Sequence, residues 1–160
     1  MGQGYDVHRL VSGRALILAG VRIPHETGLL GHSDADVLMH AIIDAVLGAT
    51  AQGDIGTWFS DTDPTYHNAD SGQLLQHVMQ HLTDKQYRVV NLDATVICQS
   101  PRLAPYVQVM RDNLSRLLGI PVDRINMKAK TNEKLGYLGR QEAIEAQAVV
   151  LISQGSEVSG

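Results

Sequence analysis

Gly4-Tyr5-Asp6-Val7-His8, near the N-terminus, places a carboxylate and an imidazole two residues apart. Residues i and i+2 of a β-strand point to the same face, so Asp6 and His8 are predicted to stand side by side. His40, inside a helical pattern further along, would supply a third metal ligand. A zinc ion held by three such groups keeps its fourth tetrahedral position open, which is typical of catalytic sites. The spacing alone also fits an ordinary surface pair, so both interpretations stand at this point.

The composition is that of a single globular domain. The 160 residues are 44% hydrophobic and 19% charged, with a net charge of −4 that argues against nucleic acid as a partner. The one cysteine, Cys98, excludes an intramolecular disulfide and suits a reducing compartment. No apolar run approaches the length of a membrane span, and no signal peptide is visible, so we expect no membrane partner.

Strand and helix patterns alternate along the chain. Amphipathic helices are predicted at residues 34–49, 70–83 and 103–118, and glycine-rich or polar loops at 28–33 and 53–64. The strand patterns cover residues 4–10, 15–19, 21–23, 87–98, 125–129 and 144–152. We expect an α/β (α+β) fold with one mixed sheet of about four main strands and helices on one face. Residues 1–153 form the predicted catalytic domain, and 154–160 a disordered tail.

His40 has an aspartate on either side in the helix predicted at 34–49. Asp36 and Asp44 lie one turn before and one turn after it. A metal-bound histidine usually donates its second ring N–H to a carboxylate or carbonyl, and either aspartate fits that role. The alternative is a solvated helix face with two helical ion pairs. The helix can be capped by Ser33 or Asp34.

Several stretches in register resemble the 2-C-methyl-D-erythritol 2,4-cyclodiphosphate synthase family of the non-mevalonate isoprenoid pathway. The resemblance extends over residues 4–152. It rests on Gly4-Tyr5-Asp6-Val7-His8-Arg9-Leu10, Gly20-Val21-Arg22-Ile23-Pro24, Gly28-Leu29-Leu30-Gly31-His32-Ser33-Asp34-Ala35-Asp36-Val37, Gly53-Asp54-Ile55-Gly56, Phe59-Ser60-Asp61-Thr62-Asp63-Pro64 and Asn132-Glu133-Lys134-Leu135-Gly136-Tyr137 with Gly139-Arg140.

The resemblance implies a homotrimer with active sites between adjacent subunits. The implied substrate is 4-diphosphocytidyl-2-C-methyl-D-erythritol 2-phosphate, whose 2-phosphate attacks the β-phosphorus of its own diphosphate and expels CMP. The expected location is the bacterial cytoplasm or, after removal of a transit peptide, the plastid stroma. A further implied feature is a central trimer cavity for an isoprenoid diphosphate near Tyr5, Arg140 and Gln147.

Site residues follow from the same resemblance, position by position. Asp6, His8 and His40 fall on the zinc ligands, and Glu133 on the position of a second cation, Mg²⁺ or Mn²⁺. His32 and Thr131 fall on transition-state stabilisers. The other implied substrate contacts are Ser33, Asp54, Ile55 and Gly56 for the methylerythritol group, Asp61, Thr62 and Asp63 in the following loop, Ser100, Arg102, Leu103, Ala104, Ala129, Lys130 and Asn132 for a cytidine pocket from the neighbouring subunit, and Tyr137 and Arg140.

The chain departs from the family pattern in several places. Ser60 stands where proline is expected, and Lys130-Thr131-Asn132 replaces a run richer in threonine. Gln141 and Ala143 stand where small residues commonly follow Arg140, which argues against the isoprenoid ligand here. From the residues themselves, Arg102 and Lys130 fit phosphate contact and plain solvation equally. Two other functions are compatible with the residues: a zinc-dependent phosphate-ester hydrolase, which would release inorganic phosphate, and a non-catalytic module that binds a nucleotide or an isoprenoid diphosphate.

Overall fold

The computed structural model describes residues 1–155 and contains one five-stranded mixed sheet. The strand order is β4-β1-β7-β5-β6, and only β5 and β6 run parallel. The strands are β1 (Gly2–Ser12), β4 (Thr27–Leu29), β5 (Tyr87–Ile97), β6 (Ile125–Lys130) and β7 (Ala143–Gln154). The predicted mixed sheet is confirmed, with β4 as an additional edge strand. The sequence predicts a loop here because β4 is only three residues long and contains Gly28. In the structure Gly28 pairs with Val11 of β1.

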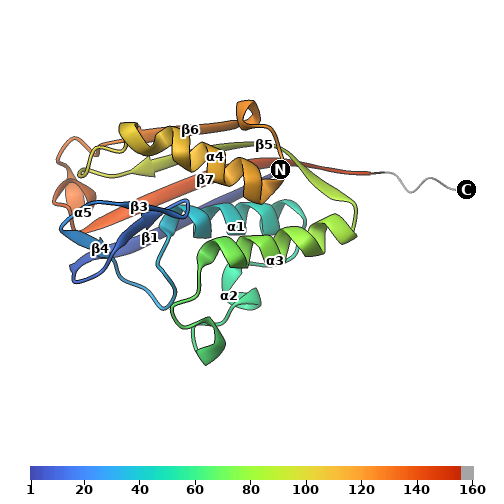
Figure 1. Ribbon diagram of the computed structural model, residues 1–160, viewed down its shortest axis with the longest axis horizontal. Helices are drawn as coiled ribbons and strands as arrows, with labels where there is room; N and C mark the ends of the chain where they lie inside the picture. Colours follow the sequence, from blue (N-terminus) through green and yellow to red (C-terminus); the bar gives the residue numbers. More distant parts are fainter. Residues whose placement is uncertain (156–160) are drawn as a thin grey trace, which may run out of the picture.

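The three long helices cover one face of this sheet (Figure 1). They are α1 (Val37–Ala49), α3 (Ser71–Asp84) and α4 (Val107–Leu118). Alternate residues of β7, from Ile144 to Val150, are buried beneath the helices, while those between them face outward. A separate hairpin joins β2 (Leu16–Leu18) to β3 (Val21–Ile23) through Ala19 and Gly20, both at positive φ. Within the described residues, no helix is both long and apolar enough to cross a membrane.

Several short helical elements occur where the sequence predicts a loop or the first turn of a longer helix. The predicted loop at 53–64 contains α2 (Ile55–Trp58), because the Asp54 carboxylate accepts from the Thr57 N–H and caps a single turn. The sequence also predicts a loop running into a short helix at residues 131–138, and α5 (Gly136–Gly139) confirms that short helix. Single 3-10 turns occur at η1 (Pro64–Tyr66), η2 (Ala104–Tyr106) and η3 (Val122–Arg124), of which η2 replaces the expected start of the third helix.

The first helix begins later than predicted, at Val37 rather than at residue 34. Ala35 has φ 56°, which interrupts the helix, and the Asp36 carboxylate accepts from the Met39 N–H as the N-cap. The predicted caps Ser33 and Asp34 therefore lie outside the helix and are free for other contacts. At the other end of the chain, β7 extends to Gln154, one residue into the predicted tail, and residues 156–160 of that tail lie outside the described part.

Candidate active site

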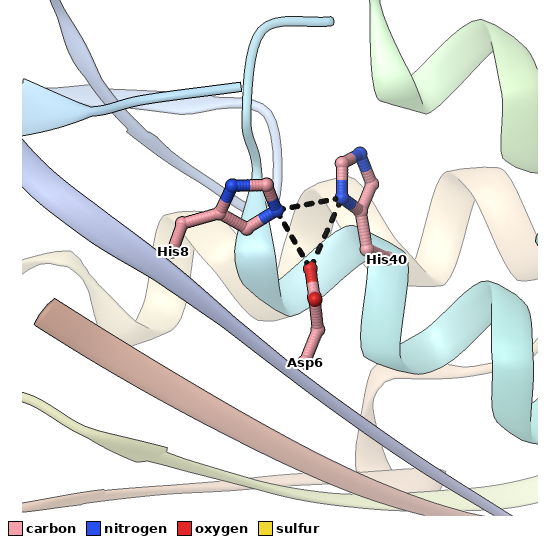
Figure 2. Close-up of side chains that lie close together, drawn as sticks. All are labelled: Asp6, His8 and His40. Carbon is pink, nitrogen blue, oxygen red and sulfur yellow. Dashed lines mark hydrogen bonds and ion pairs between the residues drawn. The ribbon is translucent and has the colours of Figure 1, made fainter. Parts of the chain in front are cut away.

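Asp6 and His8 from β1 and His40 from α1 converge on one point (Figure 2). Asp6 Oδ2 lies 2.9 Å from His8 Nε2 and 3.1 Å from His40 Nδ1, and the two nitrogens are 3.2 Å apart. Bonds of 2.0–2.1 Å to a tetrahedral zinc ion would place neighbouring ligand atoms about 3.3 Å apart. The triangle is close to that size, so the three side chains form a group able to hold a divalent metal ion, as predicted.

The tautomer of His8 is fixed by a backbone contact. His8 Nδ1 lies 2.7 Å from the carbonyl oxygen of Leu30. A carbonyl can only accept a hydrogen bond, so Nδ1 carries the hydrogen and donates it. In the neutral ring Nε2 then presents its lone pair to Asp6 and His40. This is the arrangement that a metal-bound histidine requires, with the outward nitrogen held by a carbonyl.

His40 uses the opposite nitrogen. Its Nδ1 faces Asp6, while Nε2 lies 2.9 Å from Ser71 Oγ and 3.2 Å from Ser33 Oγ. The expectation that Asp36 or Asp44 accepts from His40 is wrong, and so is the alternative of a solvated helix face. The Asp36 carboxylate is fully buried and accepts from the N–H groups of Ala19, Gly20 and Met39; that of Asp44 accepts from the Ile55 N–H.

The electrostatics of the cluster favour cation binding. Burial acts to raise the pKa of Asp6, but hydrogen bonds from His40 and His8 outweigh it and lower the pKa to about 2. Burial acts to lower the pKa of His8, and the contact with Asp6 outweighs it and raises the pKa. When both rings are neutral and carry their hydrogen on the outward nitrogen, those hydrogen bonds to Asp6 are lost, and two lone pairs and a carboxylate meet at one point. Such a concentration of negative charge needs a proton or a metal ion between its members, so the donor set fits a divalent metal.

A cavity of about 260 Å³ opens beside this cluster. The structure places five of the predicted substrate-contacting or catalytic residues on its wall: His32, Ser33, Ile55, Gly56 and Asp61. The wall also includes Asp44, one helical turn from His40, and four residues that were not among the predicted contacts: Gly31, Phe59, Tyr66 and Leu74. Phe59 and Tyr66 pack edge to face, with ring centroids 5.2 Å apart. Phe59 begins one of the family motifs, whereas Tyr66 lies outside them.

Three neighbouring predicted residues do not line the cavity. Asp54 caps α2 and also accepts from the Thr57 hydroxyl. Thr62 Oγ1 lies 2.8 Å from Ser60 Oγ, and the Asp63 carboxylate caps η1 through the Thr65 N–H. The Asp63 carbonyl is nevertheless 3.3 Å from His32 Nε2, so this loop contacts the site through its backbone.

The remaining predicted residues form a second group at the carboxyl ends of β5 and β6. The Thr131 hydroxyl donates to Glu133, and the Gln99 side chain accepts from the N–H groups of Asn132 and Lys134. Gln99 therefore organises this group. No member lines the cavity beside Asp6 within the same chain. The same holds for Tyr137, which donates to Glu145, and for Arg140, which pairs with Glu142 at 3.2 Å. The other members are Ser100, Arg102, Leu103, Ala104, Ala129 and Lys130.

Comparison with known proteins gives one consistent result. The model of the YgbB family matches residues 1–153. The chain is 61% identical to the 2-C-methyl-D-erythritol 2,4-cyclodiphosphate synthase of Dechloromonas aromatica, over 96% of each chain. It is 59% identical to the protein of the same name from Burkholderia thailandensis, over 95% of this chain and 94% of the relative. A solved structure of such a synthase in a CDP-bound form superposes with a TM-score of 0.87 at 39% identity, over 95% of this chain and 99% of that one.

Proposed function

Because the chain belongs to the YgbB family and its relatives are 2-C-methyl-D-erythritol 2,4-cyclodiphosphate synthases, we propose that it catalyses that cyclisation. The substrate is 4-diphosphocytidyl-2-C-methyl-D-erythritol 2-phosphate. An oxygen of its 2-phosphate bonds to the β-phosphorus, the bond from that phosphorus to the bridging oxygen breaks, and CMP leaves with the bonding electrons. The enzyme is thus a phosphorus–oxygen lyase. The observation that carries the proposal is the convergence of Asp6, His8 and His40 at the wall of the cavity.

Nucleophile and leaving group belong to one molecule, so the protein has to align them and reduce their repulsion. Asp6, His8 and His40 would hold Zn²⁺, and Glu133 would help to hold Mg²⁺ or Mn²⁺. When bound, these ions supply charge neutralisation at the diphosphate. His32 and Thr131 hydrogen-bond the phosphoryl oxygens as charge redistributes, and the contribution to rate is the part that is stronger in the transition state. Ser33, Ile55 and Gly56 hold the methylerythritol group against the cavity wall.

Two features support a homotrimer with shared active sites. The face of the sheet away from the helices exposes apolar side chains along two adjacent inner strands, β1 and β7: Tyr5, Val7, Val149 and Leu151. A patch of this kind is typical of a protein–protein interface. The group around Thr131 and Glu133 lies outside the cavity of its own chain, as expected if it completes the site of a neighbour. The cytidine diphosphate part of the substrate would bind there, and the bacterial relatives support a cytoplasmic location.

Product analysis tests the proposal. Purified protein with Zn²⁺ and Mg²⁺ is incubated with the substrate, and the products are separated and identified by ³¹P NMR. We expect CMP and the cyclic diphosphate in equal amounts. Free inorganic phosphate would instead support the zinc-dependent phosphate-ester hydrolase, and ligand binding without turnover would support a binding module. Neither of those alternatives has support among the named relatives.

A further inference from the structure

The outward nitrogen of His40 has a partner that is fully buried. Ser71, the first residue of α3, has no exposed surface, and its Oγ lies 2.9 Å from His40 Nε2. The Ser71 hydroxyl makes a short contact with the Asp34 carboxylate. We propose that Ser71 and Asp34 are positioning residues, which act through His40 by holding its ring and leaving Nδ1 free for the metal. The inference deepens the proposed function and rests on it.

The Asp34 carboxylate sets the direction of the hydrogen bonds that link Asp34, Ser71 and His40. The Asp34 carboxylate can only accept, and it also accepts from the backbone N–H groups of Ser71, at 3.0 Å, and Asp36, at 3.2 Å. The Ser71 hydroxyl hydrogen therefore points to Asp34. A lone pair of Ser71 Oγ is then left for His40, so Nε2 donates its hydrogen to Ser71. The hydrogen of a neutral His40 ring is thereby held on Nε2, and Nδ1 faces Asp6 and His8 with its lone pair.

Ser33 is the competing partner, and it does not determine the direction. Its Oγ lies 3.2 Å from His40 Nε2, farther than that of Ser71, and accepts from the Ala35 N–H at 3.2 Å. No carboxylate orients the Ser33 hydroxyl among the contacts of the described residues. Ser33 could donate to Nε2 or accept from it, and only acceptance is compatible with a metal on Nδ1. The pair Ser71–Asp34 selects that state.

The pair is held in place by backbone contacts between two segments far apart in sequence. The Asp34 N–H donates to the Ala69 carbonyl at 3.0 Å, and the Asn68 N–H donates to the His32 carbonyl at 2.8 Å. The loop that carries His32 and Ser33 is therefore fixed to the start of α3. If Ser71 had only a structural role, it would do no more than help to hold this loop against the start of α3. A positioning role predicts in addition that the affinity of the folded protein for zinc depends on its hydroxyl.

The test measures zinc affinity directly, by competition of the metal-free full-length protein with a chromophoric chelator. Ser71→Ala is expected to weaken zinc binding by about 10- to 100-fold, as for other residues that orient a metal ligand. Ser71→Thr, which keeps the hydroxyl, should restore most of the affinity. Asp34→Asn should also weaken zinc binding. The new side-chain amide can donate to Ser71 Oγ, which would reverse the direction of the hydrogen bonds between this position, Ser71 and His40. This substitution also serves as a second variant if Ser71→Ala does not fold.

Two controls separate positioning from stability. Ser115→Ala removes a half-buried hydroxyl that donates to the Ile120 carbonyl at the end of α4, and this variant should retain the zinc affinity of the wild type. The melting temperature of each metal-free variant is measured alongside. Unchanged zinc affinity in Ser71→Ala, with or without a lower melting temperature, would overturn the inference about Ser71 and Asp34 and leave the proposed function intact. Failure of the wild type to bind zinc would overturn the metal centre of the proposed function itself.

Discussion

Gly4 of β1 packs directly against Ala41 of α1, so closely that a Cβ atom at Gly4 would overlap the Ala41 carbonyl oxygen. Gly2 has the same relationship to Ala45, one turn along the helix. Two positions without side chains thus let the helix backbone approach the strand. Asp6 follows Gly4 by two residues on the same face, and His40 directly precedes Ala41. This close approach is what brings the strand ligands and the helix ligand within reach of one ion.

Gly4→Ala is therefore expected to impair both stability and metal binding. Forcing a methyl group into this contact should lower the free energy of unfolding by about 1–3 kcal/mol. Because β1 and α1 must separate, zinc affinity should fall as well. The matched control is Gly48→Ala in the same helix, where the new Cβ would meet nothing closer than 3.9 Å. Thermal unfolding and zinc titration of both variants check the prediction, and equal behaviour of the two would contradict it.

Loss of a single ligand should abolish the metal centre. His40→Ala removes the only ligand from α1, and we expect loss of bound zinc and a fall in CMP release of about 100-fold or more. His77→Ala, which changes an exposed histidine of α3, is the control and should retain both. Zinc is measured by atomic emission and CMP by chromatography. Retention of zinc and activity by His40→Ala would show that the assignment of His40 is wrong.

Zinc should stabilise the folded chain through the same three side chains. A metal that binds only the folded state at 1,000 times its Kd adds about 4 kcal/mol to the free energy of unfolding. We expect the melting temperature to fall when a chelator removes zinc and to recover when zinc is restored. In Asp6→Asn, which keeps the shape but loses the charge, this response should largely disappear. An equal response in that variant would place the stabilising ion elsewhere.

Two inactive variants should complement each other if the site is shared between subunits. His40→Ala damages the metal centre, and Glu133→Gln damages the second group. Trimers refolded from an equal mixture would contain about a quarter of their sites with neither change, because one subunit contributes each half. CMP release should therefore return to about that fraction of the wild-type rate. Each variant refolded alone is the control, and a mixture no more active than these would exclude shared sites.

Cys98 should be unreactive at neutral pH and should destabilise the fold in alkali. It is buried, and burial raises the pKa of its thiol to about 11, although a hydrogen bond from the Ser100 backbone acts in the opposite direction. Since the ordinary value is 9.0, the folded chain holds its proton more tightly than the unfolded one. The resulting stabilisation is full below pH 9 and is lost as the pH rises towards 11.

Alkylation kinetics check this directly. At pH 8 the thiolate fraction of the folded protein should be about 100-fold lower than in denaturant, so iodoacetamide should react correspondingly more slowly. Alkaline unfolding of Cys98→Ala should show a weaker dependence on pH between 9 and 11 than that of the wild type. A thiol that reacts equally fast in both states would contradict the assigned burial effect.

The sequence by itself determined most of the fold and the identity of the metal cluster. Period-two patterns located β1, β5, β6 and β7, and the apolar stripe of α1 placed His40 on a helix, because these periodicities follow directly from strand and helix geometry. The pairing of Asp6 with His8 follows from the same rule. Edge strand β4 and the capped turn α2 were missed because each is only three or four residues long, and β4 also depends on pairing with the distant strand β1.

Only the tertiary structure decided what lies behind the metal ligands. Sequence spacing makes Asp36, one turn from His40, a reasonable acceptor for the His40 ring. Its carboxylate instead accepts hydrogen bonds from the backbone N–H groups of Ala19 and Gly20 in the β2–β3 turn. The acceptor is Ser71, 31 residues from His40, and it is held by Asp34 across a gap of 37 residues. Local spacing carries no information about such contacts, because they depend on how two separate segments pack. Sequence therefore identified the ligands, and packing determined which of their nitrogens is left for the metal.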